Sequence, residues 1–228
     1  MLSTIAIVPS APVMVPELAS SAAAETEDVR RAALAAVREL PGRWIAVGAA
    51  PADGVFGSES VGTFAGYGVD VRVGLSSGRD EAPIALPLCV LVAGWLRGVA
   101  SPDARVEVHS FGADHDADTA AVLGRQLRAQ IDSAGEDVGV LVIADGANTL
   151  SPPAPGGYDP EAVPAQAAFD DALAAGDTAG LSALSGGAVG RVAYQVLAGL
   201  VGTKPRSAKE LYRGAPYGVG YFVGVWTL

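Results

Sequence analysis

The chain has 228 residues, of which 50% are hydrophobic, and its formal net charge is −10 at pH 7. This length and apolar content predict a single domain over residues 1–228 with one substantial core. The 25 acidic residues outnumber the 15 basic ones, which argues against a nucleic-acid backbone or an anionic membrane surface as the partner. Because the chain has one cysteine, Cys89, an internal disulfide is excluded.

The N-terminal stretch is a poor match to a signal peptide, because it lacks a basic region and prolines interrupt its apolar run. No apolar run elsewhere reaches the ~20 residues that a membrane span needs. We therefore expect a cytoplasmic protein without a membrane partner.

Strands and helices alternate in the first half of the chain. Apolar runs of strand length end in loops rich in proline and glycine, and helices begin at capping residues followed by acidic side chains. The expected strands are at 2–8, 44–49, 69–73 and 105–110, and the expected helices are at 20–39, 86–98 and from Asp116 or Asp118 to 132.

The second half begins with the most apolar strand, residues 138–143, which has the composition of a strand buried on both faces. Further helices are expected from 159, from 177 and over 187–200, and a closing hairpin over 209–212 and 219–226. This order predicts an α/β three-layer sandwich, with a central mostly parallel or mixed sheet flanked by helices and an antiparallel margin.

Polar residues follow three of the expected strands. Ser10 follows the first, Asp53 the second, and Asp145 and Asn148 the apolar strand at 138–143. Parallel strands present their carboxyl ends at one edge of a sheet, where ligands of open α/β proteins gather. The alternative is that Asp145 and Asn148 only satisfy backbone groups of a connection.

Three segments together resemble the family of class III extradiol ring-cleavage dioxygenases. They are IVPSAPVMVPEL near the N-terminus, ADGANTLSPPAPGGYDPEA followed by Phe169-Asp170, and APYGVGYFVGVW near the C-terminus. They occur in the family's order and span nearly the whole chain. The resemblance implies the family's α/β fold.

The resemblance also implies where the family's catalytic groups fall. Family enzymes hold one ferrous ion with two histidines and a glutamate, and use a further histidine as acid/base. The ligand positions fall on Ser10, near Ala52 and Asp53, and on Ala188, and the acid/base position falls on Asn148. Only Asp53 could coordinate a metal, so no cofactor is predicted and the catalytic residue is unknown.

Three functional interpretations remain open. We favour the first, in which the chain is a degenerate, dioxygenase-like pseudoenzyme that binds a small neutral or aromatic ligand or has an assembly role. Alternatively, it is an active ring-opening dioxygenase or other metal-dependent enzyme whose ligands have moved to Asp53, Asp145 or the cluster around His115. In the third, it is a structural partner, as non-catalytic subunits are. A homo-oligomer is compatible with the sequence.

The expected pocket is bounded by the residue pairs 9–10 and 52–53 and by the loop 145–148, with Tyr158 and Tyr217 as its apolar wall. The Asp145 carboxylate is expected to accept backbone N–H groups of residues 147–149. The run at 113–118 contains three carboxylates and His115, and we favour helix capping over metal binding there.

Overall fold

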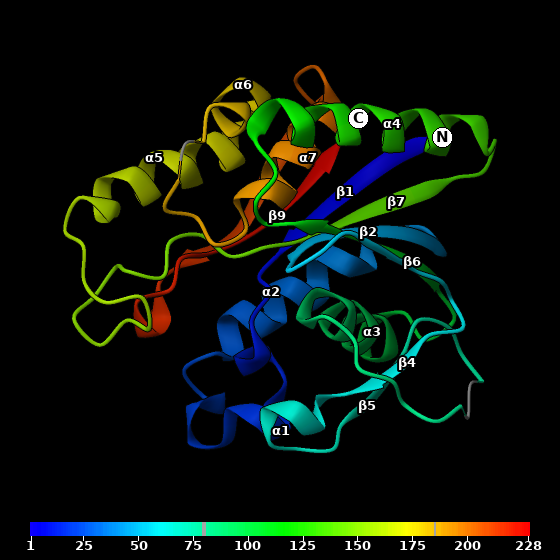
Figure 1. Cartoon of the computed structure of the whole chain (residues 1–228), viewed down its shortest axis with the longest axis horizontal. Helices are drawn as coiled ribbons and strands as arrows, with labels where there is room; N and C mark the ends of the chain where they lie inside the picture. Colours follow the sequence, from blue (N-terminus) through cyan, green and yellow to red (C-terminus); the bar gives the residue numbers. More distant parts are fainter. Residues whose placement is uncertain (79–80, 185) are drawn as a thin grey trace.

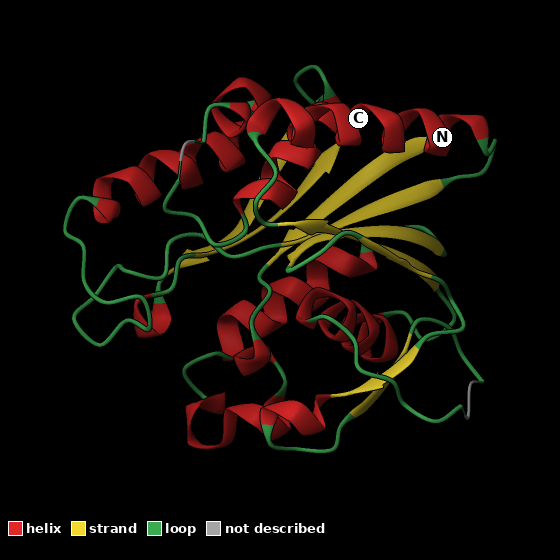
Figure 2. Ribbon diagram, in the orientation of Figure 1, coloured by secondary structure: helices red, strands yellow, loops and turns green. Residues whose placement is uncertain are grey.

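The computed structural model describes residues 1–78, 81–184 and 186–228. It has one mixed seven-stranded sheet between two layers of helices, which confirms the predicted three-layer α/β sandwich (Figures 1 and 2). The strands are β1 (Leu2–Val8), β2 (Arg43–Ala50), β3 (Gly54–Phe56), β6 (Arg105–Gly112), β7 (Val138–Ile143), β8 (Ser207–Gly214) and β9 (Tyr221–Thr227).

The strand order is β3-β6-β2-β7-β1-β9-β8, with the four parallel strands β6, β2, β7 and β1 adjacent to one another. β3, β8 and β9 run antiparallel to their neighbours and form the margins. Every residue of β7 is buried, as its uninterrupted apolar sequence predicts. Two short strands, β4 (Val61–Thr63) and β5 (Arg72–Gly74), pair with each other apart from the main sheet.

The helices divide between the two faces of the sheet. The helices α2 and α3 contribute to the core on one face, and α4, α5, α6 and α7 contribute to the core on the other (Figure 1). Their bounds are α1 (Pro16–Ala19), α2 (Glu27–Arg38), α3 (Leu88–Ala100), α4 (Ala117–Ser133), α5 (Ala162–Ala175), α6 (Thr178–Ser182) and α7 (Arg191–Val201). Short 3-10 helices lie at η1 (Pro12–Met14), η2 (Ser20–Ala23), η3 (Phe64–Tyr67) and η4 (Pro216–Gly218). Among the described helices, none has the length and apolar character needed to cross a membrane.

Four expected boundaries differ from the structure by three residues or more. The helix expected from residue 159 begins at Ala162. The helix expected from residue 20 begins at Glu27, because Ser20 has a φ of 47° and ends α1 instead of starting a long helix. The strand expected over 69–73 is confined to β5 and lies outside the main sheet. The helix expected over 187–200 begins at Arg191, because the backbone just before it pairs with the loop after β7.

Candidate functional site at the carboxyl edge of the sheet

The carboxyl ends of β1, β2, β6 and β7 lie along one edge, since these strands are parallel and adjacent. The chain leaves β1 toward helices on one face and leaves β6 and β7 toward helices on the other, whereas β2 leads through residues 51–53 into β3, which pairs with β6. The neighbours β7 and β1 therefore diverge at this edge. Such points of divergence are where open α/β sheets bind ligands.

Ser10 and Asp145 meet in the crevice between β1 and β7. The ladder between these strands ends where the Ala144 N–H donates to the Val8 carbonyl at 3.0 Å. Beyond it, the Ser10 N–H donates to Asp145 Oδ1 at 2.8 Å, and the Ala144 carbonyl accepts the Tyr194 hydroxyl at 2.8 Å. The Asp145 carboxyl thus takes the place of a backbone acceptor where the two strands separate.

The position of Asp145 changes its acidity. Burial raises the pKa of its carboxyl to about 7, although the hydrogen bond from Ser10 acts in the opposite direction. Within the described part of the chain, its other oxygen has no hydrogen-bond partner. Burial and the nearby Asp145 raise the pKa of the Tyr221 hydroxyl, which also lacks a partner among the described residues. With a pKa of about 7, the Asp145 carboxyl is divided between its neutral and charged forms near neutral pH.

The expectation for the partners of Asp145 needs correction. Its carboxyl accepts the N–H of Ser10, across the crevice, and not the N–H groups of residues 147–149. The N–H of Ala147 instead donates to Gln166 Oε1 at 2.8 Å. The reason is that the Ser10 N–H lies just beyond the last backbone bond between β1 and β7, where the Asp145 carboxyl supplies its acceptor.

Backbone pairing fixes the loop after β7 on both sides. The Gly146 N–H donates to the Gly220 carbonyl at 2.8 Å, and the Gly220 N–H donates to the Ala147 carbonyl at 2.7 Å. On its other side, Ala147 and Ala188 form an antiparallel bridge. Asn148 follows directly, and its carbonyl accepts the Gly156 N–H at 2.9 Å. The structure thus brings the predicted positions Asn148 and Ala188 close together.

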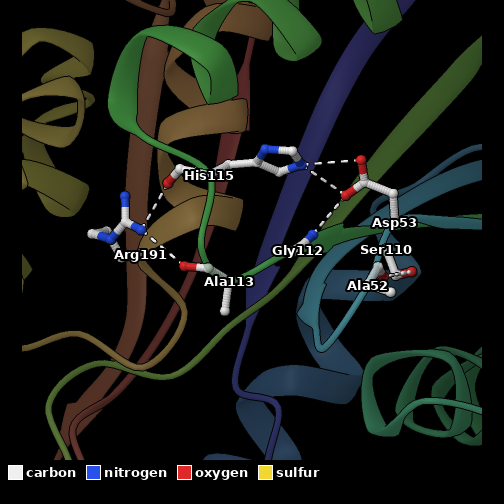
Figure 3. Close-up of polar contacts among 7 residues, drawn as sticks. All are labelled: Ala52, Asp53, Ser110, Gly112, Ala113, His115 and Arg191. Atoms are coloured by element: carbon white, nitrogen blue, oxygen red, sulfur yellow. Dashed lines mark hydrogen bonds and ion pairs between the residues drawn. The ribbon is translucent and has the colours of Figure 1, made fainter.

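A second polar cluster occupies the crevice between β2 and β6 (Figure 3). His115 Nε2 lies 2.8 Å from Oδ1 and 3.0 Å from Oδ2 of Asp53, and the Gly112 N–H donates to Asp53 Oδ1 at 2.7 Å. The Gly112 N–H and then the His115 ring lower the pKa of Asp53. Ala52, the other candidate here, accepts the Ser110 hydroxyl through its carbonyl at 3.1 Å.

Arg191, the first residue of α7, holds the loop that carries His115. Its guanidinium donates to the Ala113 carbonyl at 2.9 Å and to the His115 carbonyl at 2.8 Å (Figure 3). It also donates to Gln195 Oε1 at 2.7 Å. Neither Arg191 nor the pairing of His115 was identified from the sequence. The sequence contains no local signal for either, because the contacts join positions far apart in the chain.

The capping interpretation of residues 113–118 is supported for one residue. Asp116 accepts the Thr119 N–H at 2.7 Å and caps α4. In residues 1–78, 81–184 and 186–228, no group of three or more histidine, cysteine, aspartate or glutamate side chains is placed to hold a metal ion.

The two tyrosines expected as an apolar wall are both largely exposed. The Tyr217 hydroxyl donates to Glu25 Oε2 at 2.7 Å, and Tyr217 has a φ of 62°, in the left-handed region. A cavity of about 190 Å³ lies between the loop after β7, α5 and α6, and small apolar side chains dominate its wall. Its described lining residues are Ala147, Ala162, Ala165, Gln166, Phe169, Gly180, Ala183, Leu184, Gly186, Gly187 and Ala188.

The fold and this edge define an α/β sandwich with two polar clusters at the carboxyl ends of its parallel strands. No protein-family model matches the chain. No curated protein matches it either. Among solved structures, it is similar to an uncharacterized protein, JW3007, from Escherichia coli K12, with a TM-score of 0.54 and 12% identity over 98% of this chain and 99% of that chain. This similarity supports a shared fold.

Proposed function

We propose that the chain is an extradiol dioxygenase-like protein that lacks the family's ferrous iron site and binds a small neutral or aromatic molecule at the carboxyl edge of its sheet. The observation that carries this proposal is the state of the four positions to which the resemblance assigns catalytic groups. Ser10, Asp53, Asn148 and Ala188 all follow or border the parallel strands at that edge.

Their side chains do not fit ferrous iron. Non-haem iron sites use two imidazoles and a carboxylate that leave coordination positions open. Ala188 has no donor atom, and a serine hydroxyl such as that of Ser10 is a poor ligand for this ion. Asp53 has a carboxylate, but the Gly112 N–H and His115 Nε2 already bond to it. We therefore derive no step that passes through iron.

The polar groups at this edge favour a neutral ligand. The carboxyl of Asp145, with a pKa of about 7 and one oxygen without a partner in the described chain, can donate or accept a hydrogen bond near neutral pH. Tyr221 begins β9 beside the end of β1, because Gly224 pairs with Ile7. The Tyr221 hydroxyl is a second group that can donate or accept a hydrogen bond. Such groups bind uncharged hydroxyl or carbonyl substituents without a counter-ion.

The first test is metal content and catechol cleavage. Protein purified anaerobically from iron-replete cells should contain iron well below one equivalent per chain, and it should not cleave protocatechuate or catechol. Iron at one equivalent together with turnover would instead support the alternative of an active dioxygenase with relocated ligands.

The second test is binding, measured with catechol as a neutral aromatic probe. In NMR titrations, catechol should shift the amide resonances of Ser10 and Asp145, and Asp145→Asn should weaken the effect. The exposed Tyr158→Phe is the matched control and should leave it unchanged. Shifts confined to residues far from this edge, or none at millimolar catechol, would contradict the proposed ligand site.

A further inference from the structure

The proposed function leaves the pair formed by Asp53 and His115 without a role. Asp53 comes from the loop after β2, and His115 from the loop after β6. Both Asp53 oxygens contact the same ring nitrogen, Nε2 (Figure 3). The Gly112 N–H holds Asp53 Oδ1 from the other side. A carboxylate that holds one nitrogen of an imidazole fixes the tautomer, which leaves the other nitrogen as the acceptor.

That other nitrogen, Nδ1, is available. Figure 3 shows it on the side of the ring away from Asp53, and within the described part of the chain it has no hydrogen-bond partner. No fully buried side-chain nitrogen or oxygen of the described residues lacks a partner, so Nδ1 is reachable from solvent. The His115 side chain is 25% exposed. The imidazole is therefore held firmly at one nitrogen and open at the other.

The backbone that carries His115 is also held in place. The Arg191 guanidinium donates to the carbonyls of Ala113 and His115, and Asp116 caps α4 directly after the histidine. A mobile side chain is a weaker catalyst because it spends little time in the reactive geometry. A base that is held by a carboxylate and by its own loop has much less of this conformational freedom. These contacts place a preorganised imidazole at the carboxyl edge of the sheet, where the loop from β2 to β3 meets the loop after β6.

We propose that Asp53 and His115 form a metal-independent general-base site, in which His115 Nδ1 takes the proton of a water or alcohol hydroxyl that attacks a small neutral acyl compound. His115 is the catalytic residue and Asp53 its positioning residue. This inference does not rest on the proposed function, because it uses neither the resemblance nor the Asp145 crevice.

In the hydrolytic step, the O–H bond of water breaks and its proton passes to Nδ1. The water oxygen forms a bond to the acyl carbon, and the bond from that carbon to the leaving oxygen breaks. The leaving oxygen keeps the electron pair of that bond, and the proton then passes from Nδ1 to the leaving oxygen or to solvent. Water is the only co-reactant, and no oxidation or reduction takes place.

The charges around the pair select against anions. Asp114, Asp116 and Asp118 lie on the loop and first helical turn around His115, and all three are exposed. The Arg191 guanidinium bonds only to neutral oxygens and keeps its charge, so it offsets one of these three carboxylates and leaves the surroundings of His115 negative. A neutral or cationic acyl compound can approach Nδ1, whereas an anionic one is repelled.

The test uses p-nitrophenyl acetate with the full chain, and nitrophenolate release gives kcat/KM. His115→Gln should lower kcat/KM by about a hundredfold, which is the lower end of what a positioned base contributes. Asp53→Asn keeps an acceptor for Nε2 but loses the charge, so it should give an intermediate loss. The matched control is His109→Gln, because His109 is the other histidine and also contacts a carboxylate, Glu107, at 2.8 Å. This control should retain the wild-type rate.

Three results decide the proposal. A solvent deuterium isotope effect that disappears in His115→Gln supports proton transfer in the rate-limiting step, a readout that a merely structural pair would not affect. The proposal is overturned if His115→Gln and His109→Gln lose activity equally, or if the wild type is no faster than free imidazole at the same concentration. The charge argument is overturned if the anionic 3-acetoxy-4-nitrobenzoate, corrected for its uncatalysed rate, is hydrolysed as fast as p-nitrophenyl acetate.

Discussion

Asp145→Asn should make the protein more stable at pH 8 and leave its stability nearly unchanged at pH 4. The asparagine Oδ1 can still accept the Ser10 N–H, so the substitution removes the charge and keeps the hydrogen bond. In the folded protein, burial raises the pKa of Asp145 from 3.8 to about 7. The wild type therefore holds a proton at this site that the unfolded chain has already released.

The magnitude follows from this difference in pKa. A carboxyl with a raised pKa contributes its stability fully below the unfolded value near 4 and loses it as the pH rises toward 7. Each pKa unit corresponds to about 1.4 kcal/mol, so the wild type loses up to about 4 kcal/mol of unfolding free energy across this range. Asparagine does not titrate. The gain from Asp145→Asn should therefore grow from near zero at pH 4 to about 4 kcal/mol at pH 8.

Urea unfolding of the wild type and Asp145→Asn at pH 4, 6 and 8 measures this difference. Asp103→Asn is the matched control, because Asp103 is exposed in the turn before β6. Its curve should stay close to that of the wild type at each pH. The reasoning is refuted if the free energies of wild type and Asp145→Asn differ by the same amount at all three pH values.

The other predictions concern packing, a buried hydrogen bond and a helix cap. Gly124→Ala should destabilise the protein by about 1–3 kcal/mol, because an added Cβ would lie 2.1 Å from the Val196 carbonyl oxygen where α4 meets α7. Tyr194→Phe should lower the unfolding free energy by about 1–3 kcal/mol, since it leaves the buried Ala144 carbonyl without its hydroxyl donor. Asp116→Ala should lower the midpoint of thermal unfolding, because the Thr119 N–H loses its cap.

Each of these predictions has a control of the same chemical type, measured by the same unfolding experiments. Gly98→Ala adds a Cβ that meets nothing within 4 Å and should not destabilise the protein. Tyr158→Phe removes an exposed hydroxyl, and Asp118→Ala removes an exposed carboxylate that lies beside the cap without being the cap. Equal effects in a variant and its control would contradict the corresponding explanation.

The parts of the fold that the sequence predicts well are those with a strong local cause. The apolar run of β7 is an example, because side chains buried on both faces leave no polar alternation in the sequence. The second half of β1, from Ile5 to Val8, is buried in the same way. The start of α4 is another. Two aspartates compete for the cap in the sequence, and the structure selects Asp116, whose side chain reaches the Thr119 N–H.

The sequence could not predict which strand ends become neighbours. Asp53 and His115 meet because β6 lies beside β2 in the sheet, and that order depends on how the helices between them cross the sheet. Likewise, Asp145 pairs with Ser10 and not with its own loop, because β7 inserts between β1 and β2. The parallel strands place Ser10, Asp53 and Asp145 at one edge, but the individual contacts depend on long-range packing.

The two polar clusters are connected by one helix. Arg191 and Tyr194 lie on the same side of α7, because residues three apart on a helix are neighbours. Arg191 holds the carbonyl of His115 beside the β2/β6 crevice, and Tyr194 holds the Ala144 carbonyl in the β1/β7 crevice. The first turn of α7 therefore fixes the geometry of both crevices. A displacement of this turn would move the loop that carries His115 and the strand end that carries Asp145 together.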